Sequence, residues 1–209
     1  MFVWMNSKSY FPTRIYNEKL TNFSLSKFNK ELTKECFKIR DYDKVGRTWS
    51  KKNYVGGYTS YASMPQLQQF SSTFLDLEKK ITTHVKRFTT ELEFDLKGKS
   101  IGMTDCWLNM MPAHTAHGLH LHPNSFISGT YYVSTPKASA AIKFEDPRLD
   151  RFMCAPPRKA NCKKENKPFV SISVEQGMLV LFESWLRHEV PASTNEDERI
   201  SVSFNYSWW

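Results

Sequence analysis

The sequence predicts a mainly β fold with flanking helices, and two observations support this prediction. From residue 100 onward, short apolar runs are separated by Gly, Pro and polar residues, a pattern typical of a β-sandwich or barrel. Aromatic residues, which fit pleated sheets well, make up 14% of the 209 residues. We therefore expect a single domain over 1–209, with a helical support region at 1–99 and a β-core at 100–209.

Two amphipathic helices are expected in the support region. Apolar residues recur at helical spacing within 24–39, and in alternating steps of three and four within 65–92. Pro65 stands near the start of the second segment, where its missing N–H costs little. The stretch 41–63 between them is rich in Gly, Tyr, Ser and Lys and is expected to be irregular. Both apolar stripes are interpreted as faces that pack on the core.

Seven strands are expected in the β-core. Each is a short run of apolar or alternating character that turn residues bound on both sides. The expected strands are 103–111, 118–122, 127–133, 140–144, 169–174, 178–183 and 199–206.

The net positive charge of the chain limits the kinds of partner that it is expected to bind. The net charge is +8, and the charge is spread out, so it is interpreted mainly as a solubilising surface. A non-catalytic nucleic-acid-binding module with salt-dependent affinity stays an alternative, although the chain holds no recognised nucleic-acid motif. The N-terminus lacks a signal-peptide pattern, no apolar run could span a bilayer, and the cysteines form no CxxC pair, so we expect a cytoplasmic protein without a membrane partner.

Histidines are concentrated at one place in the β-core. Four of the six fall within 114–122, and in a strand His120 and His122 would point to the same face. His188 follows the expected strand 178–183 and can supply a third ligand from a facing strand. Three ligands on one side of a metal leave the other positions open, which is the facial arrangement of non-haem iron oxygenases. His84 and His114 are interpreted as structural, and His117 as a neighbour of the site.

The last expected strand carries a second signal. From Arg199 to Asn205, apolar and polar residues alternate strictly, so that one face is polar. An inward-facing Arg199 can grip a carboxylate with two charge-assisted hydrogen bonds, and Ser201 can add a third.

Together these residues resemble the superfamily of iron(II)- and 2-oxoglutarate-dependent oxygenases, and within it a group of oxygenases found in bacteria and phages. The resemblance covers almost the whole chain and is most specific in its second half. The segments that carry it are Phe11–Tyr16, Trp107–Asn109, His120–Val133, Phe144–Arg148, Gly177–His188 and Glu198–Asn205.

The resemblance implies a double-stranded β-helix, a jelly-roll or cupin-like core, that binds Fe(II) and uses 2-oxoglutarate and O2. It matches His120 and His188 to metal ligands, and Arg199 and Ser201 to the residues that hold 2-oxoglutarate. Asn109 and Tyr132 stand where related oxygenases contact this cosubstrate. The implied activity is a dioxygenase, of hydroxylase type, whose substrate is a peptide, a nucleobase or a small metabolite.

One position departs from the superfamily pattern, because His122 stands where an Asp or Glu is usual. Three-histidine iron sites occur in dioxygenases without 2-oxoglutarate, so a cupin-like three-histidine metalloenzyme is an alternative in which Arg199 binds a substrate acid. Glu145 or Asp146 could also supply an oxygen ligand, although their spacing fits the motif less well.

The connection 146–168 contains four prolines and seven basic residues and is expected to be irregular. Two interpretations stay open for it. It either forms a basic lip over the iron site that selects an anionic or polar substrate, or it is a solvated surface loop.

Overall fold

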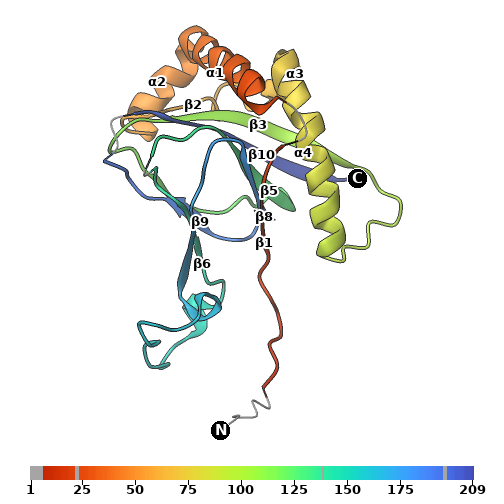
Figure 1. The fold of residues 1–209 in the computed structure, drawn as a ribbon, viewed down its shortest axis with the longest axis vertical. Helices are drawn as coiled ribbons and strands as arrows, with labels where there is room; N and C mark the ends of the chain where they lie inside the picture. The colour runs from red at the N-terminus through yellow and green to blue at the C-terminus, as the bar shows by residue number, and fades with distance from the viewer. Residues whose placement is uncertain (1–6, 22–23, 138, 195–196) are drawn as a thin grey trace.

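Two antiparallel sheets form the core of the computed structural model, which describes residues 7–21, 24–137, 139–194 and 197–209 (Figure 1). The larger sheet has, in spatial order, β1 Ile15–Lys19, β8 Met178–Glu183, β5 Ile127–Ser134, β10 Arg199–Trp208, β3 Ile101–Met111 and β2 Tyr58–Thr59. The smaller sheet has β4 His117–His120, β9 His188–Val190, β6 Ile142–Glu145 and β7 Phe169–Ile172. The mainly β prediction with a double-stranded β-helix core is confirmed.

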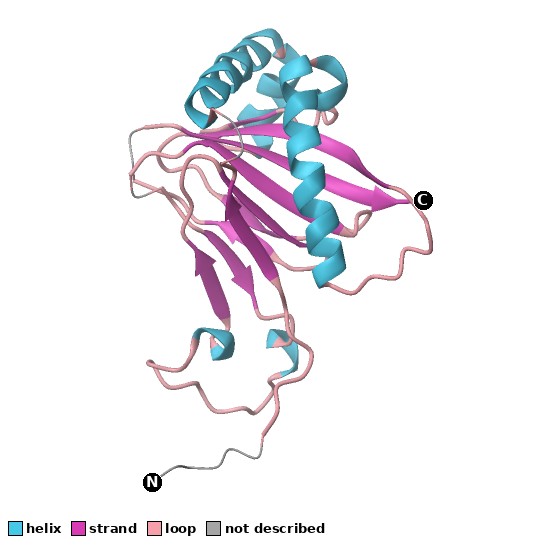
Figure 2. Ribbon diagram, turned by 45° about the vertical axis from the view of Figure 1, so that its right-hand side comes forward, coloured by secondary structure: helices cyan, strands magenta, loops and turns pink. Residues whose placement is uncertain are grey.

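Helices cover one face of the larger sheet (Figure 2). They are α1 Leu25–Tyr42, α2 Lys44–Asn53, α3 Leu67–Phe70 and α4 Ser72–Glu91. The apolar stripe of α4 is buried against the sheet, and each of its large side chains contributes roughly 1.5–3 kcal/mol by leaving water. The helix expected over 24–39 is therefore confirmed by α1, and the main part of 65–92 by α4.

The expectation of one continuous helix over 65–92 is wrong at Ser71. This residue is extended, with φ −135° and ψ 128°, and separates α3 from α4. The start of the segment is fixed to the sheet, because the N–H of Cys106 on β3 donates to the carbonyl of Pro65 at 2.6 Å. The chain must therefore turn before α4 can run across the sheet.

The expectation that 41–63 is irregular is also wrong, since this stretch contains α2 and β2. The carboxylate of Asp43 accepts a hydrogen bond from the N–H of Gly46 at 2.8 Å and so caps the first turn of α2. The same carboxylate accepts from the hydroxyls of Tyr58 and Ser63, at 2.9 Å and 2.5 Å. Tertiary contacts of one buried carboxylate thus stabilise a helix that contains an unfavourable Gly46.

Strand β10 has the alternation that the sequence predicted. Its apolar residues Ile200, Val202, Phe204 and Tyr206 belong to the cluster shared with the helices. Its polar residues face the other way, where Tyr132, Phe144, Phe182 and their neighbours join the two sheets in a second cluster. The polar face of β10 therefore lies between the sheets.

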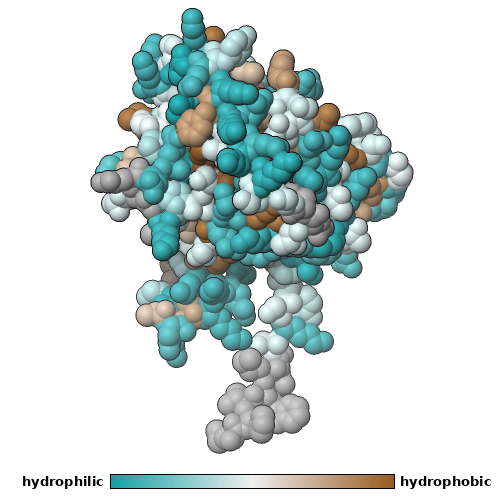
Figure 3. All heavy atoms as spheres, turned by 45° about the horizontal axis from the view of Figure 1, so that its top comes forward, coloured by the Kyte–Doolittle hydropathy of each residue, from teal (hydrophilic) through white to brown (hydrophobic). Residues whose placement is uncertain are grey.

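All seven expected strands are present, β8 with the expected ends and the other six with shifted ends, and sequence reasoning missed β1, β2 and β9. The strand expected over 118–122 ends at His120. Among the described residues, no helix is both long and apolar enough to cross a membrane. On the side where the helical layer comes forward, polar side chains dominate the surface and hydrophobic ones are scattered (Figure 3).

Candidate metal and cosubstrate site

Two histidines face each other across neighbouring strands of the smaller sheet. His120, the last residue of β4, is the direct partner of His188, the first residue of β9. Their ring centroids lie 4.3 Å apart. Side chains of directly opposed antiparallel residues leave the same face of the sheet, so both imidazoles enter one space.

His122 joins these two rings from outside the strand. The prediction that it shares a face with His120 assumed a strand over 118–122, and this assumption is wrong. Instead, the N–H of His122 donates to the carbonyl of Ser184 at 2.9 Å, which fixes the segment after β4 against the turn that follows β8. The ring of His122 stacks on that of His188 at 5.3 Å with an interplanar angle of 5°.

The three side chains form a group that could hold one metal ion. One ligand atom of each residue lies within 4.8 Å of those of the other two. The Nδ1 atoms of His120 and His188 lie 2.7 Å and 3.0 Å from the carbonyl oxygens of Gly118 and Leu186. Since a carbonyl only accepts, each Nδ1 carries the proton and each Nε2 keeps its lone pair for a metal.

Burial keeps these imidazoles neutral. It lowers the pKa of His122 to about 3 and that of His188 to about 4, and it also lowers the pKa of His120. A depressed histidine pKa means that the ring is uncharged at neutral pH, which is the form that binds a metal. No protons need to be removed before an ion enters.

A small cavity of about 30 Å³ continues inward from the histidines to the polar face of β10. Asn109, Arg199 and Ser201 line it together with all three histidines of the group. Tyr132 is not among its lining residues, but its ring lies under the Arg199 guanidinium, 4.9 Å from the centroid. The structure thus brings all seven predicted site residues into one region.

Several buried polar atoms of this region have no partner among the described residues. They are Oδ1 of Asn109, the hydroxyl of Tyr132 and Nε of Arg199. A buried polar atom without a hydrogen bond costs about 1–3 kcal/mol, so three of them beside one cavity indicate a missing polar ligand. Donors and acceptors of this kind, next to a neutral histidine triad, fit a metal ion with a bound carboxylate compound.

A wider pocket of about 600 Å³ opens outward from the same histidines. His117, His120 and His122 line both this outer pocket and the inner cavity, so the histidines stand between the two. The outer wall comes from Trp49, Tyr54 and Tyr61, which sequence reasoning missed because it read 41–63 as irregular.

Asp105 was missed as well, although its spacing gave a signal. It stands at period two from Trp107 and Asn109, so the three share one face of β3.

Residues considered as alternative ligands lie elsewhere. Glu145 pairs with Arg187 at 2.8 Å and Asp146 pairs with Arg148 at 2.9 Å, and neither belongs to the histidine group. His84, predicted to be structural, lies 2.7 Å from the hydroxyl of Tyr16. His117 stacks on His120 at 4.4 Å, as a neighbour of the site, but on strand β4.

The basic-lip interpretation of 146–168 is not supported. Within the described residues, none from this connection lines either the outer pocket or the inner cavity. The connection instead extends from the far ends of β6 and β7, beside the N-terminal segment (Figures 1 and 2).

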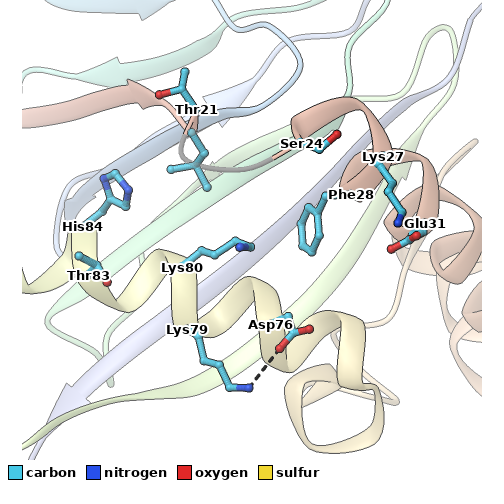
Figure 4. Close-up of a pocket in the computed structure, with 11 residues that line it drawn as sticks. Thr21, Ser24, Lys27, Phe28, Glu31, Asp76, Lys79, Lys80, Thr83 and His84 are labelled. Carbon is cyan, nitrogen blue, oxygen red and sulfur yellow. Dashed lines mark hydrogen bonds and ion pairs between the residues drawn. The ribbon is translucent and has the colours of Figure 1, made fainter.

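A separate cavity of about 600 Å³ lies between α1 and α4, on the helix-covered side of the larger sheet (Figure 4). Its charged side chains come in both signs, and Lys79 pairs with Asp76 at 3.1 Å. It contains His84 but no member of the metal group, so we do not assign the chemistry to it.

Comparisons with known proteins agree with this geometry. Residues 105–205 match a family whose description is "Putative 2OG-Fe(II) oxygenase". No curated protein sequence matches the chain significantly. A similar solved structure is the non-heme alpha-ketoglutarate-dependent epimerase SnoN from nogalamycin biosynthesis, with 12% identity over 93% of this chain and 76% of that one and a TM-score of 0.65.

Two further structures have the same fold. HygX from Streptomyces hygroscopicus, crystallised with nickel, 2-oxoglutarate and hygromycin B, is 13% identical over 93% of this chain and 83% of that one, with a TM-score of 0.61. A prolyl-4-hydroxylase from Pseudomonas putida is 12% identical over 92% of both chains, with a TM-score of 0.57. The chain also matches an oxidoreductase from Burkholderia pseudomallei, and it spans 46% of the length of that protein.

Proposed function

We propose that this chain, which belongs through residues 105–205 to the 2OG-Fe(II) oxygenase family, is a hydroxylase whose iron is held by His120, His122 and His188. The observation that carries the ligand assignment is the meeting of three neutral imidazoles, from two strands and one loop, within 4.8 Å. The class of enzyme is that of the family, and the Pseudomonas putida prolyl-4-hydroxylase supports the hydroxylase type.

Arg199 would hold the cosubstrate. Its buried guanidinium donates from Nη1 to the carbonyl of Ala140 at 3.1 Å and leaves Nε without a partner among the described residues. A carboxylate of 2-oxoglutarate would satisfy Nε, and Ser201 on the same strand face would donate a further hydrogen bond. Stacking on Tyr132 holds the guanidinium plane in position.

Asn109 completes the polar wall beside Arg199. Its Nδ2 donates to Ser203 at 3.0 Å, so its orientation is fixed and Oδ1 is the free atom. A carbonyl oxygen only accepts, and this atom would therefore bind a hydroxyl or a water that accompanies the cosubstrate. When bound, Fe(II) with 2-oxoglutarate supplies the activation of O2 for oxidation of a C–H bond.

The protein's own residues then orient the parts and exclude water. The inner cavity is small, and Ile142, Phe182 and Val190 form its apolar lining, whereas the outer pocket can admit a substrate. The histidines separate the two spaces, so a cosubstrate on Arg199 and a substrate in the outer pocket would approach the metal from different directions.

Metal binding and 2-oxoglutarate turnover test this proposal. We expect about one Fe(II), or one Ni(II) or Zn(II) surrogate, per chain and aerobic conversion of 2-oxoglutarate to succinate, as a single facial site predicts. His188→Ala should abolish both, because it removes one of three ligands. His84→Gln is the matched control, since it changes a histidine on α4 and keeps a hydrogen-bonding group near Tyr16. Unchanged metal content in His188→Ala would contradict the ligand assignment.

A further inference from the structure

The outer pocket has an unusual charge pattern for so basic a protein. The chain carries 29 Lys and Arg against 21 Asp and Glu, yet no Lys or Arg of the described residues lines this pocket. Asp105 is the one acidic side chain that the described part of the chain places in its wall. The ionised side chain of this wall is therefore opposite in sign to the net charge of the whole chain.

Asp105 is held with one oxygen open. Its Oδ2 accepts hydrogen bonds from Nδ2 of Asn205 at 3.2 Å and from the hydroxyl of Thr104 at 2.9 Å. Asn205 is itself fixed, because its Oδ1 accepts from the hydroxyl of Ser128 at 2.8 Å. Among the described residues none donates to Oδ1 of Asp105, so this oxygen can receive a ligand's N–H.

Aromatic rings form a further part of the pocket wall. Trp49 and Tyr61 are 37% and 53% exposed, and Tyr61 packs edge-on against Trp107 at 5.1 Å. Trp107 in turn lies 5.7 Å from the ring of His122. The faces of such rings attract cations, most strongly when the cation is partly removed from water.

Within the outer pocket, Asp105 lies far along strand β10 from the cosubstrate residue Arg199, because Asp105 pairs with Asn205. Asn205 and Arg199 are six residues apart on the same polar face of β10, which corresponds to about 20 Å. A positive group thus stands beside the inner cavity and a negative group in the outer pocket. Anions are attracted to the first group and cations to the second.

We propose that the outer pocket binds an organic cation, and that the substrate presents an ammonium or guanidinium group to Asp105 with its carbon frame against Trp49, Tyr61 and Trp107. This proposal rests on the oxygenase function, because it places the uncharged part of the substrate toward the histidines. It replaces the anionic or polar substrate that the loop 146–168 suggested.

Three small probes of similar size and different charge test the preference: phenethylamine, 2-phenylethanol and 3-phenylpropionate. Their affinities are measured by saturation-transfer NMR titration, with the metal-free chain and again with Ni(II) and 2-oxoglutarate added. We expect phenethylamine to bind about fivefold tighter than the alcohol, as one partly exposed ion pair can provide, and 3-phenylpropionate to bind most weakly.

Variants separate the charge from the rings. Asp105→Asn should remove most of the preference for phenethylamine over the alcohol, with the remainder owed to the rings, and should leave the alcohol affinity unchanged. Asp95→Asn, an exposed acid outside the pocket, is the matched control and should change neither. Tyr61→Leu keeps apolar area but removes a π face, so it should weaken the amine more than the alcohol.

The outcomes distinguish this proposal from the function on which it rests. Tightest binding of 3-phenylpropionate, or equal amine affinity in wild type and Asp105→Asn, would overturn the cation site. Ni(II) and 2-oxoglutarate should still bind to Asp105→Asn, which also shows that the variant is folded. Failure of the wild type to bind Ni(II) would overturn the metal site alone, since the amine preference is also measured without metal.

Discussion

At the scale of single residues, Arg199 has the most informative surroundings. It is only 5% exposed, it lies over the ring of Tyr132, and its Nε has no partner among the described residues. Leaving part of a guanidinium unsatisfied in the interior is costly, and it is explained if a carboxylate completes the contacts. The consequences for cosubstrate binding can be measured directly.

Arg199→Ala should weaken 2-oxoglutarate binding about 10- to 100-fold, which corresponds to the loss of charge-assisted hydrogen bonds. Arg199→Lys should be a poor substitute, because an ammonium cannot make the bidentate contact. Calorimetric titration of 2-oxoglutarate into the Ni(II)-loaded protein measures both, and Ni(II) binding itself should persist. Arg148→Ala, which removes an exposed arginine paired with Asp146, is the control. Equal cosubstrate affinity in wild type and Arg199→Ala would favour the cupin-like three-histidine alternative.

His122→Asp tests the ligand that departs from the superfamily pattern. The aspartate would supply an oxygen ligand from the same backbone position, which the hydrogen bond to Ser184 fixes. We expect Ni(II) affinity to stay within about tenfold of wild type, because carboxylate and imidazole are both good ligands for this ion. Loss of metal comparable to that in His188→Ala would show that the site cannot accept the usual carboxylate.

For single residues, the sequence predicted correctly where the spacing within one strand determines the face to which a side chain points. The alternation of Arg199 and Ser201 with apolar neighbours predicted which side chains face inward, and β10 has that alternation. His122 reached its predicted neighbours for another reason, a backbone hydrogen bond across 62 positions of the chain. Such a contact has no local signature, and neither has the open oxygen of Asp105.

At the scale of elements, α2 shows how tertiary contacts override propensity. Its sequence contains Gly46 and an exposed Val45, so no apolar stripe predicts a helix. The buried carboxylate of Asp43 connects the helix start to Tyr58 on β2 and to Ser63. Since α2 and the residues after it carry Trp49 and Tyr54, this one cap helps position the wall of the outer pocket.

Asp43→Ala should lower the free energy of unfolding by about 2–4 kcal/mol. The change removes an N-cap and leaves the buried hydroxyl of Tyr58 without its acceptor. Urea unfolding measures the loss, with Asp41→Ala as a control whose effect should stay within about 0.5 kcal/mol, because Asp41 is exposed. If the two variants are equally stable, the cap does not hold this part of the fold.

At the scale of the whole molecule, the arrangement of two sheets determines which loops reach the site. The sequence predicted seven strands and a double-stranded β-helix, but not which sheet edge each connection would approach. The connection 146–168 therefore looked like a lip, whereas its base is closed by a hydrogen bond from Asp146 N–H to the carbonyl of Pro168, at the far ends of β6 and β7. Pairings between distant strands, such as β4 with β9, decide this placement and are not encoded in any local window.

Replacing 151–165 by a short Gly/Ser linker should leave the chemistry intact. The segment lines neither the outer pocket nor the inner cavity, and shortening a surface loop changes stability by about 1 kcal/mol or less. Succinate formation and phenethylamine affinity, measured as above, should both match wild type. A selective loss of substrate oxidation with normal 2-oxoglutarate turnover would restore the lip interpretation.

The smaller sheet has one more consequence, for local opening of the molecule. Strand β4 lies at the edge of this sheet and, among the strands of the described residues, pairs only with β9, through His117 with Val190 and His120 with His188. An ion shared by His120, His122 and His188 would link β4 to β9.

An opening that releases the metal becomes less favourable by about 2.7 kcal/mol when the free metal concentration is about one hundred times its Kd. Amide hydrogen exchange around β4 and β9 should therefore slow by up to about 100-fold. Amides of α1 that exchange through local opening should exchange at the same rate with and without metal. In His188→Ala, metal should no longer slow exchange around β4 and β9. Metal binding would thus turn a strand edge that can open by itself into one that opens only when the ion is released.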